Sequence, residues 1–242
     1  MPVQIENFID IHSHILPGLD DGAKDMAESL EIARRYESTG IKKVIATPHF
    51  LPGTAWAFKK DVVLQSIREL QANLDQNRIG LQVLPGMEIA YHKRLEERLL
   101  ANSLLPLAES GYYLIEPSFH GEQDSLQECL QSLLKTGKKL ILAHPERIDR
   151  LHNRLEMIES LVKQGLLIQV NTGSLLGYFG PESLNAANRL HQKHCLHFIA
   201  SDAHNPLKRA PLNGDEWLKI FALQDGEEIL RICNNNINKI FT

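Results

Sequence analysis

The segment "IDIHSHILPGLDDG" (residues 9–22) places three polar side chains at alternate positions of an otherwise apolar run. Asp10, His12 and His14 would point to the same side of a β-strand, because side chains alternate between its two faces. Buried imidazoles need partners, since an unpaired buried polar group is costly. The partner is either a metal ion or, in the plainer alternative, a hydrogen-bonded side chain of the core.

Similar residues occur near the carboxyl ends of the later apolar runs. They are His49 in "ATPH", Glu88 in "PGMEI", Glu116 in "LIEP", His144 in "AHPER", and Asp202 and His204 in "SDAH". With an aspartate from "LDDG" this makes nine possible ligands, all nitrogen or oxygen donors. Such a set suits two or three divalent ions, and Mn, Zn or Fe better than Mg alone. The alternative is a set of buried polar residues that satisfy one another.

Apolar runs alternate with amphipathic stretches about seven times, which predicts the elements that position these residues. The expected strands span 7–12, 42–49, 81–89, 112–117, 139–145, 166–171 and 196–202. The expected helices span 25–40, 60–77, 94–101, 123–137, 154–165, 181–194 and 215–233. Continuous apolar strands joined by helices predict an α/β fold with a parallel sheet, in one domain over residues 1–242. We expect a distorted TIM-like (β/α)7 barrel, because a barrel brings the ends of seven strands to one mouth.

Composition and charge exclude several classes of function. The net charge of −4 gives no indication of a nucleic-acid-binding surface. No apolar run is long enough to insert into a membrane, and the first residues lack the pattern of a signal peptide, so we expect a cytoplasmic protein. The three cysteines, Cys129, Cys195 and Cys233, are not followed by arginine six positions later. This excludes the C-x5-R loop of thiol-based phosphatases, and we interpret all three as structural.

The motifs "DIHSH", "TPH", "GMEI", "IEP", "AHPER" and "SDAH" occur in that order and resemble the polymerase-and-histidinol-phosphatase (PHP) superfamily. The longer stretches "NTGSLLGYFG" and "HFIASDAHN" and the first block through "TPHF" are similar to a narrower group, the bacterial metal-dependent protein-tyrosine phosphatases of capsular and exopolysaccharide synthesis. The resemblance covers nearly the whole chain. It implies the PHP fold, a distorted seven-stranded β/α barrel, with a manganese-preferring centre of three metal ions.

The resemblance also implies roles for individual residues. The implied metal ligands are His12, His14, Asp21, His49, Glu88, Glu116, His144, Asp202 and His204. Arg147 and Arg209 would contact the phosphate. The chain departs from the family pattern in two places: Glu116 is followed directly by Pro117, and Arg209 lies before "APL" instead of a tighter Arg-Pro. Asp10 is expected to hydrogen-bond a ligand imidazole, and Asp20 is the neighbour that could be confused with Asp21.

The implied activity is hydrolysis of phosphotyrosine by a metal-held hydroxide, on the tyrosine-rich tail of a bacterial tyrosine kinase that regulates polysaccharide synthesis. Two alternatives stay open: another PHP phosphoesterase of the histidinol-phosphate phosphatase type, and a non-catalytic metal-binding module.

Aromatic residues near the strand ends could line a slot for a phenyl ring, or could simply pack on the rim. They are Phe50, Trp56, Phe58, Phe119, Tyr178 and Phe179.

The other six histidines are not expected to be ligands. His92 and His120 follow the third and fourth expected strands and could rim the mouth. The remaining four lie in or beside amphipathic stretches, where solvated side chains are expected. They are His152, His191, His194 and His197.

Overall fold

The computed structural model describes residues 5, 7–118 and 123–241, and strands and helices alternate along this part of the chain. The strands are β1 Ile9–Ser13, β2 Lys43–Ala46, β3 His49–Phe50, β4 Gln82–Pro85, β5 Glu88–Ala90, β6 Tyr112–Glu116, β7 Lys139–Ala143, β8 Leu167–Asn171 and β9 Phe198–Ala200. The α-helices are α1 Met26–Ser38, α2 Lys60–Gln76, α3 Leu95–Leu100, α4 Gln123–Lys135, α5 Asp149–His152, α6 Leu155–Lys163, α7 Thr172–Leu175, α8 Pro181–Gln192, α9 Gly214–Phe221 and α10 Gly226–Phe241. Two 3₁₀ turns are η1 Leu107–Glu109 and η2 Pro145–Arg147.

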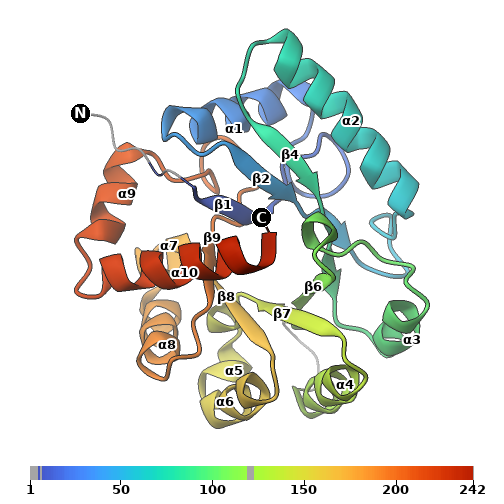
Figure 1. Ribbon diagram of the computed structural model, residues 1–242, viewed down its shortest axis with the longest axis vertical. Helices are drawn as coiled ribbons and strands as arrows, with labels where there is room; N and C mark the ends of the chain where they lie inside the picture. Colours follow the sequence, from blue (N-terminus) through green and yellow to red (C-terminus); the bar gives the residue numbers. More distant parts are fainter. Residues whose placement is uncertain (1–4, 6, 119–122, 242) are drawn as a thin grey trace.

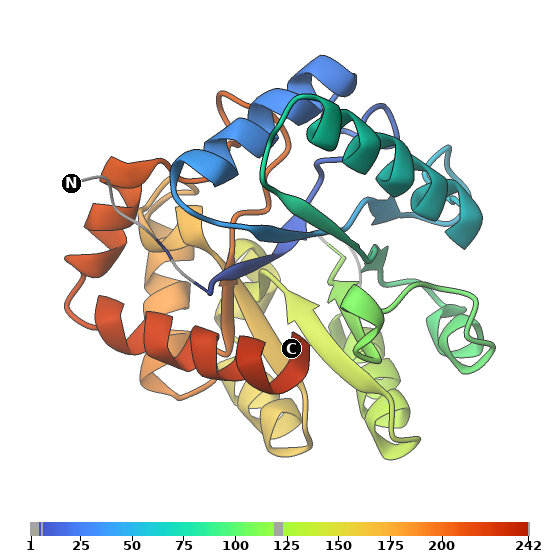
Figure 2. The ribbon, with the colours of Figure 1, turned by 45° about the horizontal axis from the view of Figure 1, so that its top comes forward.

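Every strand pair described is parallel, as the sequence predicts. The strands form a sheet of three in the order β1-β2-β4 and a sheet of six in the order β3-β5-β6-β7-β8-β9. Helices lie outside the strands all round the molecule (Figures 1 and 2). No described helix is long and apolar enough to cross a membrane.

Two of the expected strands, 42–49 and 81–89, are each broken in two, so the prediction of seven continuous strands is wrong in detail. Pro48 lies at the first break and lacks the N–H that a ladder needs. At the second break Gly86 lies so close to Ile45 that a Cβ on it would be 2.8 Å from the Ile45 Cγ2. The first half of each stretch belongs to the small sheet and the second half to the large one, which gives the barrel its distortion.

The two ends of the strand order meet where β9 lies beside β1, and we call this contact the seam. Ser13 and Ala203 form a single parallel bridge there. The His14 N–H donates to the Ala203 carbonyl at 2.8 Å, and the Asp202 N–H donates to the His12 carbonyl at 2.9 Å. The order of the strands and this contact agree with the predicted distorted β/α barrel.

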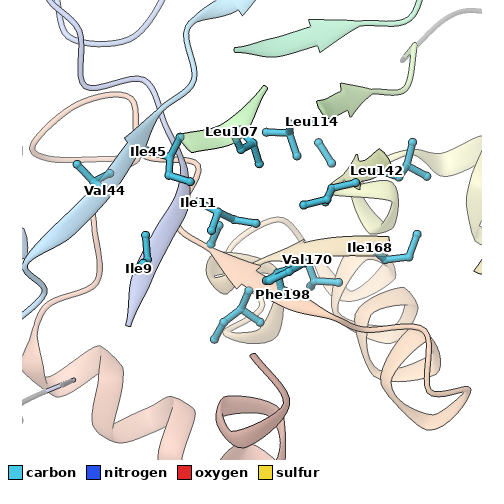
Figure 3. Close-up of a cluster of buried hydrophobic side chains, with 14 of the residues drawn as sticks. Ile9, Ile11, Val44, Ile45, Leu107, Leu114, Leu142, Ile168, Val170 and Phe198 are labelled. Carbon is cyan, nitrogen blue, oxygen red and sulfur yellow. The ribbon is translucent and has the colours of Figure 1, made fainter. Parts of the chain in front are cut away.

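The interior of the barrel is apolar. Figure 3 shows side chains from strands far apart in the sequence meeting there, among them Ile11, Leu114, Leu142 and Phe198. Each of these four is buried. Because this apolar layer fills the barrel, polar side chains can gather only at its ends, and the strand order determines which residues meet there.

The expected final helix, 215–233, is two helices, and the second continues to Phe241 through the polar "NNNINK". The break has a steric cause: a Cβ on Gly226 would lie 1.9 Å from the Ile220 carbonyl oxygen. Cys233 and Ile237 of α10 are buried, so this helix is retained by packing even though its sequence is polar.

Candidate metal centre

The structure brings all nine residues of the implied ligand set together at one end of the barrel, its mouth. They form four overlapping groups, and within each group the candidate ligand atoms lie within 4.8 Å of one another. The groups are His14, Asp21, His49 and His204; His12, Glu88 and His144; His12, His14 and Asp202; and His49, Glu88 and Glu116.

Glu88, at the start of β5, lies at the centre of these groups and is fully buried. Its Oε2 is 3.2 Å from the Nε2 of His12, 3.3 Å from the Nε2 of His14 and 3.0 Å from the Nδ1 of His49. Its Oε1 is 2.8 Å from the Nε2 of His144. One carboxylate therefore faces imidazoles from three different stretches of the barrel, as a bridging ligand would.

Asp202, just after β9, faces the imidazoles with one oxygen and two arginines with the other. Its Oδ1 is 3.6 Å from the Nε2 of His12 and 3.4 Å from the Nε2 of His14. Its Oδ2 accepts hydrogen bonds from Arg147 and from Arg209, each at 2.8 Å. Both predicted phosphate contacts thus lie directly beside the ligand groups.

The two adjacent aspartates of "LDDG" have different surroundings. Asp21 is half-exposed, and its Oδ1 is 3.4 Å from the Nε2 of His49 and 3.5 Å from the Nε2 of His204. The side chain of Asp20 instead is buried, and its Oδ2 lies 2.7 Å from the Nδ1 of His14 and accepts the His49 backbone N–H at 2.8 Å. Asp20 therefore orients a candidate ligand, a role that the sequence did not reveal.

The prediction that Asp10 would hydrogen-bond a ligand imidazole is wrong. Its Oδ1 accepts the backbone N–H of His12, and its Oδ2 accepts the hydroxyl of Tyr36 and the N–H of Ser201. The reason is a shift in strand register between Asp10 and Ser13, which breaks the simple alternation of side chains. The side chain of Asp10 hydrogen-bonds to Tyr36 of α1 and to Ser201 at the seam, whereas the imidazole of His12 lies at the barrel mouth.

The imidazole of His12 is held by a residue that sequence reasoning missed. Its Nδ1 lies 3.0 Å from the Oε1 of Gln169, whose Nε2 donates to Asn171 at 2.8 Å. The Nδ2 of Asn171 donates in turn to the Oδ2 of Asp202 at 2.8 Å. One pattern in the sequence could have identified these residues: two polar side chains, Gln169 and Asn171, at alternate positions of an otherwise apolar strand. Polar partners of this kind fix the orientation of metal-binding histidines.

Several buried polar atoms in these groups suit a cation. The Oε2 of Glu88, the Oδ1 of Asp202 and the Nε2 of His204 are buried, and although other ligand atoms lie close to them, none makes a hydrogen bond of normal geometry with them among the described residues. Burial, together with the charges of Glu88 and Asp202, raises the pKa of Glu116 well above its usual range. Burial and the charge of His14 lower the pKa of His204 to about 4, which keeps this imidazole neutral and able to bind a metal.

Two residues of the groups have strained backbone. His144, directly after β7, has φ of 29°, and Asp202, after β9, has φ of 52°. Both values lie in the left-handed region that residues with a Cβ rarely adopt. Such strain tends to be retained where it positions functional side chains, and here both residues turn at a strand end to face the mouth.

The aromatic residues that could line a slot or pack on the rim have different surroundings. Trp56 stacks on His49, with ring centroids 5.4 Å apart, and the guanidinium of Arg147 lies 4.3 Å from the ring centre of Phe179. Phe50 is buried against the core, Phe58 packs partly against it, and Tyr178 is exposed. Phe119 and His120 lie outside the described residues.

The histidines predicted to be solvated have varied surroundings. His194 is exposed, as expected. His152, His191 and His197 are half-buried, so the prediction is wrong for these three. Their partners are the Glu146 carbonyl, Asp225 and the Ile168 N–H, respectively. His92 is outside the four groups at the mouth and accepts the Arg94 N–H.

The fold and the mouth define a distorted β/α barrel with the donor set of a multinuclear metal centre. The family model described as capsular polysaccharide synthesis, CpsB/CapC, matches residues 8–242, and the chain belongs to this family.

Curated relatives and solved structures agree with this assignment. The chain is 35% identical over 228 residues to tyrosine-protein phosphatase YwqE of Bacillus subtilis, covering 94% of this chain and 89% of the relative. It is 27% identical to tyrosine-protein phosphatase CpsB of Streptococcus agalactiae, covering 91% and 92%. A solved structure described as one of the metal-dependent tyrosine phosphatases YwqE of B. subtilis and CpsB of Streptococcus pneumoniae matches with a TM-score of 0.87 and 34% identity, over 97% of this chain and 94% of that one. A histidinol phosphate phosphatase of Lactococcus lactis shares the fold, with a TM-score of 0.56 and 12% identity over 96% and 93% of the two chains.

Proposed function

We propose that the protein is a metal-dependent protein-tyrosine phosphatase whose centre is formed by the nine residues of the four groups. The observation that carries this proposal is their convergence next to two arginines that share one oxygen of Asp202. Divalent ions bound by these residues would activate water and neutralise phosphate charge. Imidazole and carboxylate donors without thiolate suit Mn, Zn or Fe. Manganese is the proposed metal among these, because the resemblance of the motifs to the metal-dependent tyrosine phosphatases implies it.

Arg147 and Arg209 would hold the phosphate. A guanidinium carries five N–H donors in a planar fork, so the contact with Asp202 is compatible with donation to phosphate oxygens. The guanidinium of Arg147 lies over the ring of Phe179, a contact that would help to position it. Donors fixed in advance stabilise the charge that develops on the phosphoryl oxygens without reorganising during the reaction.

Gln169 and Asp20 would keep the imidazoles of His12 and His14 in the orientation that presents Nε2 to the centre.

A protein thiol is not needed as the nucleophile. Burial raises the pKa of Cys129 to about 11 and that of Cys233 to about 12, so both thiols stay protonated near neutral pH. None of the three cysteines belongs to the groups at the mouth.

The proposed substrate is a phosphotyrosine-bearing protein, the tyrosine-rich tail of a kinase that regulates polysaccharide synthesis in the cytoplasm. Membership of a family described by capsular polysaccharide synthesis supports this choice. The barrel mouth, with two arginines near its surface, also suits a phosphate that projects from a larger molecule.

A substrate panel tests the proposed function. Purified protein loaded in turn with Mn, Zn or Fe should hydrolyse p-nitrophenyl phosphate and phosphotyrosine peptides, and should hydrolyse histidinol phosphate and phosphoserine peptides far more slowly. Faster hydrolysis of histidinol phosphate would assign the protein to the other class of phosphoesterase. No hydrolysis of any phosphomonoester by the metal-loaded protein would leave a non-catalytic binding module.

A further inference from the structure

A cleft of about 110 Å³ opens beside Arg209, between the segment after β8 and the segment after Asp202. The residues that matter for its chemistry are Arg35, Tyr178, Phe179, Lys208, Arg209 and Glu216. Phe179 and Arg209 also contact the candidate centre, through Arg147 and Asp202 respectively. The cleft therefore adjoins the place where the phosphate is proposed to bind.

The charges around the cleft favour an anion. Arg35, near the end of α1, and Lys208 make no ion pair among the described residues. The lining of the cleft carries three cationic side chains, those of Arg35, Lys208 and Arg209, against one carboxylate, that of Glu216, and each oxygen of this carboxylate accepts a hydrogen bond. Its Oε1 accepts the hydroxyl of Tyr178, and its Oε2 accepts the N–H of Asn213, each at 2.8 Å.

The rim of the cleft carries apolar side chains that face solvent. Leu207 is 80% exposed and Tyr178 is 53% exposed, which places both among the most exposed large hydrophobic side chains described. Exposed apolar groups beside a polar cleft are typical of surfaces that contact another polypeptide. A small phosphate ester held at the metal centre would not need them.

We propose that this cleft binds an anionic side chain next to the phosphotyrosine in the same polypeptide, with Arg35 and Lys208 as its partners. The inference rests on the proposed function and specifies its substrate class: a phosphotyrosine with acidic surroundings. The anion is a carboxylate of Asp or Glu, or the phosphate of a second phosphotyrosine. Both offer oxygens that a guanidinium and an ammonium group can bind.

The experiment compares three phosphotyrosine peptides that differ at the flanking residues: alanine, glutamate, or a non-hydrolysable phosphotyrosine analogue. For each peptide the kcat/KM is divided by the kcat/KM of p-nitrophenyl phosphate on the same enzyme. We expect the wild-type ratio to be about tenfold higher for an anionic flank than for the alanine peptide, mostly through KM. Comparing the glutamate peptide with the analogue peptide shows whether the cleft prefers a carboxylate or a phosphate.

The double variant Arg35→Ala, Lys208→Ala should lose this roughly tenfold preference. The matched control is Arg34→Ala, Lys219→Ala, which removes the same charge from two exposed residues that do not line the cleft. The control should keep the preference. Because Lys208 is exposed, Lys208→Glu is a second variant that should fold normally. With a fourth peptide added that carries a lysine flank, this variant should favour the lysine peptide over the glutamate peptide.

An unchanged preference in the double variant, or an equal loss in the control, would overturn the inference. If wild-type enzyme hydrolyses phosphotyrosine peptides regardless of their flanks, this inference fails while the proposed function stands. If it hydrolyses no phosphotyrosine substrate at all, the proposed function itself fails.

Discussion

On the β5 to β7 side of the barrel mouth, candidate ligands lie on or directly after strands paired by hydrogen-bonded ladders, whereas at the seam the two segments that carry ligands are joined by one bridge. Glu88 and Glu116 lie within the paired strands β5 and β6, and His144 directly follows β7. His14 and Asp202, at the seam, lie outside the strands and are joined there by backbone hydrogen bonds around one bridge.

Side chains replace the missing ladder at the seam. Asp10 accepts hydrogen bonds from the backbone N–H of His12 and Ser201, and so ties the two ligand-bearing segments together. Tyr36 donates to Asp10 at 3.0 Å, and the Oγ of Ser201 accepts the Ala203 N–H at 3.1 Å. Paired strands are held together by many backbone hydrogen bonds, whereas this network depends on a few buried groups. We therefore expect metal removal or a mutation to disturb the seam more than the paired strands.

Removing the metal ions should have the largest effect, because the proposed centre includes ligands from both sides. The purified protein should contain two to three divalent ions, and a strong chelator should abolish hydrolysis of p-nitrophenyl phosphate. Manganese should restore it. Metal analysis and activity on the same samples check this, and full activity after exhaustive metal removal would contradict the proposed centre.

Metal removal should also distinguish the two sides. Bound ions would link His12 and His14 to Asp202 and His204 across the seam, so chelation should speed amide exchange there most. Hydrogen exchange should rise more in residues 10–14 and 201–204 than in 139–143 of β7. Equal changes in both regions would show that the seam does not depend on the metal.

The two arginines should differ in their contribution to catalysis. Arg147→Ala should lower kcat/KM on the order of 10²–10³, because it removes a preorganised donor to the transition state. Arg147→Lys should recover only part of the loss, since an ammonium lacks the planar fork. Arg209, whose side chain is 30% exposed against 19% for Arg147, should cost on the order of tenfold when changed to alanine.

Metal content of these variants is the control, since neither arginine is expected to bind an ion. Near wild-type kinetics for Arg147→Ala with an intact fold would show that it does not contact the phosphate. A larger loss for Arg209→Ala than for Arg147→Ala would place the main phosphate contact at the seam.

Tyr36→Phe tests the seam network with a single lost hydroxyl. Removing a group that hydrogen-bonds a metal ligand typically costs roughly 10- to 100-fold in metal affinity. Tyr36 acts one step further away, through Asp10, so we expect the lower end of this range, about tenfold, for Tyr36→Phe, measured by titration with manganese, together with restored activity at high manganese concentration. The matched control is Tyr113→Phe on β6, where the ring lies near Lys138. Equal effects of the two variants would remove the distinction between seam and ladder.

The cysteines should have the smallest effect. Changing Cys129, Cys195 and Cys233 to serine together should leave turnover within a few-fold, and iodoacetamide should do little near neutral pH. The reason is burial, which keeps the pKa of all three thiols above the usual value. A folded Cys→Ser variant that loses nearly all activity would point to a thiol nucleophile.

The sequence predicted most of the fold, and the failures have local causes. The seven strand-and-helix units, their parallel order and the positions of the candidate ligands follow from periodicity and residue type, which are local properties. The breaks at Pro48, Gly86 and Gly226 were missed, although each residue was visible. Gly86 and Gly226 matter because another segment approaches them closely, and a pattern of hydrophobicity does not report such an approach.

The sequence by itself determined which atoms are available at the mouth: imidazoles and carboxylates at strand ends and two arginines shortly after them. Only the tertiary structure decided how these atoms are held. Asp10 bonds to Ser201, 191 residues away, and His12 contacts Gln169, 157 residues away. Register shifts, side-chain networks and the contact between β9 and β1 depend on how distant segments pack. Local sequence patterns determine which potential metal ligands are present at the mouth. Long-range packing determines which oxygen or nitrogen atom each of these side chains faces.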